Sequence, residues 1–94
     1  MRKIVKTQPE IVFKASNEPC EVKVCVPSTK RDGSENPLVL IHVGFAEETP
    51  KPTKVGDPMP FNSQYSVFVE AHQVVWAFSA GEALMTVAVF PWGR

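Results

Sequence analysis

Alternation of apolar and polar residues, with a period of two, is the strongest pattern along this chain. It is clearest in residues 20–26, where Val22, Val24 and Val26 are separated by more polar residues. Side chains of a β-strand point alternately to its two faces, so the three valines share one face. The pattern therefore predicts a strand that covers a core on one side and meets water or a partner on the other.

Further stretches favour strands because they are rich in β-branched and aromatic residues and are bounded by turn signals. They span residues 2–6, 11–15, 38–46, 65–71, 74–79 and 83–90. The last three are closely spaced, with predicted turns at 72–73 and 79–82, and we expect them to form the centre of the core. In the second of these turns we expect Gly81 to supply a positive φ.

These strands predict an all-β fold: a small antiparallel β-sandwich of about seven short strands in a jelly-roll-like arrangement. A chain of 94 residues is long enough for one core and too short for two, so we expect a single β domain over residues 1–94.

Residues 47–60 interrupt the strand pattern and hold four of the nine prolines. Proline donates no backbone hydrogen bond and biases the preceding residue towards extended geometry, which predicts a long proline-rich loop or arm. Loops of this length are commonly functional. Two interpretations stay open: an arm that docks on a partner, or a crossover that spans the top of the sandwich.

Charge and hydropathy exclude several classes of partner. Lysine plus arginine number 10, as do aspartate plus glutamate, so the formal net charge is +0. A nucleic-acid-binding protein normally carries a basic surplus, and we expect no nucleic-acid partner. No stretch approaches the ~18 apolar residues of a membrane-spanning helix, and we expect no membrane partner. The basic N-terminus lacks the apolar run of a signal peptide, which predicts synthesis in the cytoplasm without one.

The residue types that commonly carry catalysis or bind metals form no motif. His42 and His72 lie in no metal-binding spacing. Cys20 and Cys25 are five residues apart on one predicted strand, so their side chains point to opposite faces and two reduced thiols are expected. A metal site built from these four residues, or a nucleophilic cysteine–histidine pair, is formally open. We expect no metal, no cofactor and no enzymatic activity.

Large aromatic residues near the C-terminus predict a contact surface. Residues 74–78 are apolar at every position, whereas a strand of a two-layer sandwich has one inner face. Part of this run would stay exposed in a monomer, which is typical of an interface. The alternative is that the proline-rich segment or the C-terminal tail folds over it. The predicted interface residues are Pro50, Pro52, Val55, Met59, Trp76, Phe78 and Trp92.

The short all-β chain, neutral charge, few cysteines, proline-rich segment and valine-rich C-terminal strands are together similar in style to the small β-domains that decorate or cement phage capsids and tails. The resemblance implies a non-enzymatic structural or assembly protein of a virion, which self-associates as a homo-oligomer and docks on a larger protein lattice. The alternative is a carbohydrate- or peptide-binding module with a tryptophan as its stacking platform. An enzyme that uses Cys25 or His42 is the third hypothesis.

Overall fold

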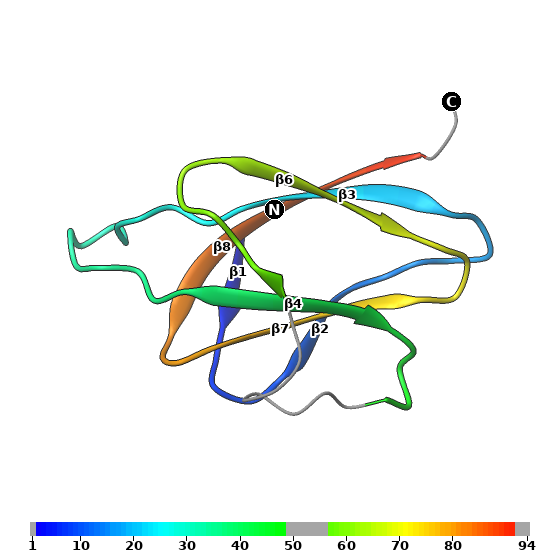
Figure 1. The fold of residues 1–94 in the computed structure, drawn as a ribbon, viewed down its shortest axis with the longest axis horizontal. Helices are drawn as coiled ribbons and strands as arrows, with labels where there is room; N and C mark the ends of the chain where they lie inside the picture. The colour runs from blue at the N-terminus through cyan, green and yellow to red at the C-terminus, as the bar shows by residue number, and fades with distance from the viewer. Residues whose placement is uncertain (1, 49–56, 92–94) are drawn as a thin grey trace.

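The computed structural model describes residues 2–48 and 57–91, which form eight β-strands and no helix (Figure 1). Seven of the strands have four residues or more, and the eighth has two. In chain order they are β1 (Arg2–Val5), β2 (Glu10–Lys14), β3 (Cys20–Cys25), β4 (Val39–Gly44), β5 (Asp57–Pro58), β6 (Gln64–Val69), β7 (Val74–Ser79) and β8 (Ala83–Pro91).

The strands form two four-stranded antiparallel sheets that pack face to face (Figure 1). One sheet, here called the β3 sheet, has the order β1-β8-β3-β6, and the other, the β7 sheet, has the order β2-β7-β4-β5. The pairing is nested: β1 pairs with β8, β2 with β7, β3 with β6 and β4 with β5. This nesting of eight strands in two sheets is the topology of a jelly roll, and it confirms the predicted β-sandwich.

The core lies between the two sheets and consists mainly of valine side chains. In β3, Val22 and Val24 are fully buried, while Glu21, Lys23 and Cys25 are half-buried on the opposite face. The same alternation holds in β8, where Met85 and Val87 are buried. Branched side chains on a pleated surface interdigitate with those of the facing sheet, so apolar burial holds the two layers together.

The strand predictions are confirmed to within two residues at each end. The prediction missed β5, whose two residues pair with Leu40 and Ile41 of β4 from within the proline-rich stretch. Pro58 is compatible with a strand here because β5 is an edge strand, where a missing N–H is tolerated. The prediction of a docked arm or a crossover for residues 47–60 falls largely on residues 49–56, which lie outside the described residues.

Backbone conformation at the turns differs in one respect from expectation. Gly33 has a φ of 87°, but Gly81 has no positive φ, so the expectation of a positive φ at Gly81 is wrong. The turn between β6 and β7 instead uses His72 at φ 68°. Asn62, at φ 60°, lies two residues before β6. Its side chain forms two hydrogen bonds with Ser28.

One buried amide ties the connection between β3 and β4 to the start of β8. Nδ2 of Asn36 donates to the carbonyl oxygens of Pro27 at 2.7 Å and Leu84 at 2.9 Å. The backbone N–H of Leu84 donates to Oδ1 of Asn36 at 2.8 Å. The side chain therefore replaces strand-like pairing at a point where the connection crosses from one sheet to the other.

We expect Asn36→Ala to lower the free energy of unfolding by about 2–4 kcal/mol, because the substitution leaves backbone groups of Pro27 and Leu84 unpaired in a buried site. Urea unfolding followed by circular dichroism measures the difference. The matched control is Asn17→Ala at an exposed turn, which should stay within about 0.5 kcal/mol of the parent. Equal effects of the two substitutions would contradict a structural role for the Asn36 amide.

Candidate interaction surface

The outer face of the β3 sheet, which points away from the core, carries apolar side chains that remain exposed. Strand register places residues of four strands on this face, because directly paired residues in antiparallel strands share a face. Three large apolar side chains stand out: Ile4 is 51% exposed, Phe68 56% and Phe90 45%. The other members of the face are Arg2, Glu21, Lys23, Cys25, Gln64, Ser66, Leu84, Thr86 and Ala88.

Phe68 and Phe90 flank Glu21 in a row across three strands. Glu21 of β3 is in register with Phe68 of β6 on one side and with Phe90 of β8 on the other. The ammonium group of Lys23 lies 5.2 Å from the centroid of the Phe90 ring, within the range of a cation–π interaction. The row therefore presents exposed aromatic side chains, a residue type enriched in protein contact sites, with Glu21 between them and Lys23 beside them.

The outer face of the β7 sheet differs along its central strand, where the large side chains are buried, while Ile11 of the neighbouring β2 is 41% exposed. Every residue of β7 is buried, including Trp76 at 6% exposure and Phe78 at 1%. The indole N–H of Trp76 donates to the carbonyl oxygen of Phe45 at 3.3 Å. The turn after β4 thus reaches the Trp76 ring, and the aromatic side chains of the central strand are buried here, unlike Phe68 and Phe90 on the other sheet.

This burial corrects the expectation that part of residues 74–78 is exposed in a monomer. Trp76 and Phe78 are inside the chain, so their side chains present no surface to a partner in this state. Met59 is also buried and belongs to the core cluster. The remaining predicted interface residues, Pro50, Pro52, Val55 and Trp92, lie outside the described residues.

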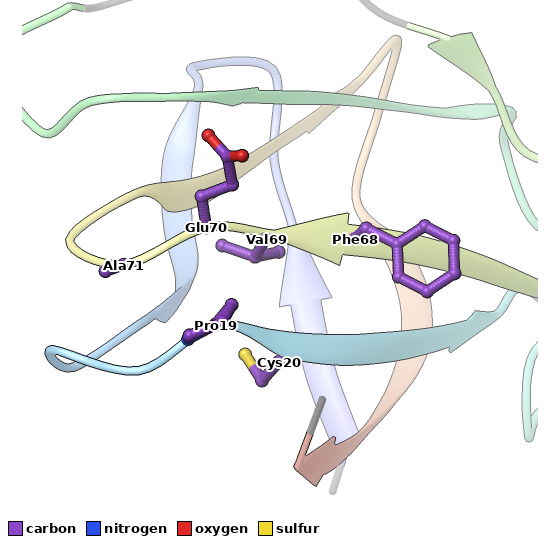
Figure 2. A pocket seen from close by; sticks show the side chains of 6 residues that line it. All are labelled: Pro19, Cys20, Phe68, Val69, Glu70 and Ala71. Carbon is purple, nitrogen blue, oxygen red and sulfur yellow. The ribbon is translucent and has the colours of Figure 1, made fainter. Parts of the chain in front are cut away.

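A hollow of about 590 Å³ lies at one corner of the β3 sheet (Figure 2). It is formed by the adjoining ends of β3 and β6 and by the turn that follows β6. The lining residues are Pro19, Cys20, Phe68, Val69, Glu70 and Ala71. Apart from the Glu70 carboxylate and the Cys20 thiol, these side chains are apolar, and pockets of such volume and character accommodate small ligands or single side chains of a partner.

The cysteines and histidines do not converge. Cys20 faces the core and Cys25 the outer side of the β3 sheet, both as free thiols, as their spacing predicts. His42 lies on the outer side of the β7 sheet in register with Trp76, and His72 is in the exposed turn before β7. Cys25 and His42 are therefore on opposite outer surfaces of the sandwich and form no nucleophilic pair. Among residues 2–48 and 57–91, no group of three or more His, Cys, Asp or Glu side chains is placed to hold a metal ion.

The sequence contains a signal for the open face in residues 65–71. Alternation in residues 65–71 places Phe68 on the face opposite Tyr65 and Val67, together with Ser66 and Glu70. A large aromatic residue among polar neighbours on a strand whose other face is apolar indicates an exposed aromatic side chain. The continuous apolar run of 74–78, by contrast, is typical of a strand buried on both faces because it has no polar positions.

Comparison with known proteins adds no assignment: no protein-family model matches the chain, and neither a curated protein nor a solved structure matches it. Within the described ranges the structure contains no helix that is long and apolar enough to cross a membrane.

We expect the two thiols to react at different rates. Burial raises the pKa of the Cys20 thiol above its ordinary value of 9.0, which favours the unreactive protonated form, whereas the Cys25 side chain is partly accessible. Iodoacetamide at pH 8 should modify Cys25 first and leave Cys20 intact until the chain unfolds. Mass spectrometry of proteolytic fragments, with and without urea, measures both rates, and equal rates in the folded protein would contradict the burial of Cys20.

The raised pKa of Cys20 also makes the stability of the fold depend on pH. The folded chain holds the Cys20 proton more tightly than the unfolded chain does, so this group destabilises folding as pH rises above 9.0. Cys20→Ala should reduce the loss of stability between pH 8 and about 10, which urea unfolding at several pH values detects.

Proposed function

We propose that this chain is a non-enzymatic assembly protein, such as a capsid decoration or tail accessory subunit of a phage, that self-associates and docks on a larger protein lattice. The observation that carries the proposal is the outer face of the β3 sheet, which exposes Ile4, Phe68 and Phe90, whereas Trp76 and Phe78 on the central strand of the other sheet are buried. When a second protein surface covers apolar side chains on an open sheet face, their removal from water makes the free energy of association more favourable.

The architecture and the charge are compatible with this role. Jelly rolls occur in viral capsid subunits, and also in lectins and cupins, so the topology by itself supports the proposal only by analogy. Because the formal net charge is +0, copies of this chain do not repel one another at long range. The open face carries Lys23, Glu21 and Arg2 beside its apolar residues, and these charges would set the orientation of a docked partner.

Light scattering coupled to size exclusion tests self-association. The wild-type chain should form a species heavier than its 10.4 kDa monomer, at a concentration-dependent fraction. Replacement of Phe68 by serine should shift it towards the monomer, because apolar area buried in the contact is lost. The control is Phe45→Ser, which removes an exposed aromatic side chain at the end of the other sheet. A monomer at all concentrations, or equal effects of the two variants, would count against the proposal.

A carbohydrate- or peptide-binding module is the second candidate, and the hollow beside Phe68 and Glu70 favours it. Trp76 is not the stacking platform, since its ring is buried. Titration of glycans and peptides into the isotopically labelled protein should then shift amide resonances of residues 68–71 and few others. Shifts scattered over both sheets, or none, would remove this candidate.

A further inference from the structure

We infer that the edge of β6 is the self-association site, where a second copy of this chain pairs its own β6 antiparallel across a twofold axis. The inference rests on the proposed function and deepens it by naming the surface. Such pairing would join two β3 sheets into one eight-stranded sheet with β6 of each copy at its centre.

The four edge strands of the sandwich differ in how they resist pairing. Natural sheets protect their edges with lysine, proline, bulges or very short strands. Three of the edges carry such features: β1 begins with Arg2 and Lys3, β2 contains a register shift between Ile11 and Phe13, and β5 is two residues long and includes a proline.

The fourth edge, β6, has none of these features. Its sequence from Gln64 to Val69 contains no charge and no proline, and its register with β3 runs without a shift over six residue pairs. Within the described part of the chain, β3 is the only strand that pairs with β6. An uncharged, regular and β-prone edge strand is a template for a further strand.

A second copy fits this edge better than an unrelated partner does. Because β6 carries no charge, two β6 strands meet without repulsion. Tyr65 and Val67 lie on the core-facing side of the strand but stay exposed or half-buried at the sheet edge, so a paired copy would cover them with the same two residue types. The covered surface is therefore self-complementary, as a twofold contact requires.

Geometry restricts the register of this pair. Directly opposite residues must share a face, so the twofold axis has to pass through a residue position and not between two. Centres at Ser66 or at Val67 give the longest overlaps. In the first, Ser66 faces its own copy, and in the second, the two Ser66 side chains are diagonal neighbours. Ser66 thus lies beside the axis in both arrangements.

The position of Ser66 allows a substitution that spares the fold. Ser66 is exposed and in register with Lys23, so Ser66→Glu creates a favourable cross-strand charge pair within one copy. Across the twofold axis, the same substitution places two carboxylates opposite or diagonal to each other. We expect the dissociation constant of the self-associated species to rise about tenfold or more.

Ala88→Glu is the matched control. Ala88 is exposed on β8, in register with the other side of Lys23, so the substitution adds the same charge to the same face but away from the β6 edge. We expect it to leave the dissociation constant within about twofold of the wild type. Thermal unfolding of both variants verifies that they fold.

Sedimentation equilibrium measures the dissociation constants. Hydrogen exchange of the amides of residues 64–67 shows whether the contact between copies lies at β6. The expected result is weaker association for Ser66→Glu alone and slower exchange of these amides at high protein concentration. Suppose that the wild type associates but Ala88→Glu weakens association as much as Ser66→Glu or more, or that exchange of the β6 amides does not depend on protein concentration. In either case the contact lies elsewhere, so this inference is wrong while the proposed function stands. A wild type that stays monomeric overturns both.

Discussion

The structure depends on the burial of the valine face of β3. This strand lies between β8 and β6, and its inward valines pack against the opposite sheet. The pairing that places β3 there is nested, so the first strand meets the last and each inner pair joins segments distant in sequence. Such long-range contacts form only after a large loss of chain entropy, and the buried apolar area between the sheets has to offset it.

A small sandwich has few residues with which to cover its outer faces, and in this chain the aromatic side chains of β7 are buried while those of the β3 sheet are exposed. The turn after β4 reaches the Trp76 ring through the Phe45 carbonyl, which satisfies the indole N–H and removes the ring from water. Phe68 and Phe90 of the β3 sheet remain in contact with solvent, and this unequal burial of aromatic side chains supports the proposed contact surface.

Local pattern predicted the strands well because a period of two is a direct consequence of strand geometry. Alternation around Val22 and Val24 gave the correct inner face, and the spacing of Cys20 and Cys25 gave opposite sides of the sheet. The exposure of Trp76 and Phe78 was predicted wrongly because the cover over a strand comes from segments far away in sequence. The two residues of β5 were not predicted because one of them is Pro58, which disfavours a strand, and their pairing depends on β4, which is distant in the sequence.

The two candidate contact surfaces are continuous, and this links self-association to docking. Phe68 belongs to β6 by sequence and to the open face by register, so the edge and the face meet along that strand. Pairing through β6 would place the open faces of two copies side by side in one sheet and would double the apolar area presented to a lattice. Each copy would then bind a repeating partner more tightly than it could alone, because the second contact forms at high effective concentration. An edge left unprotected next to an open apolar face is therefore consistent with one purpose, the assembly of a flat, two-copy contact surface.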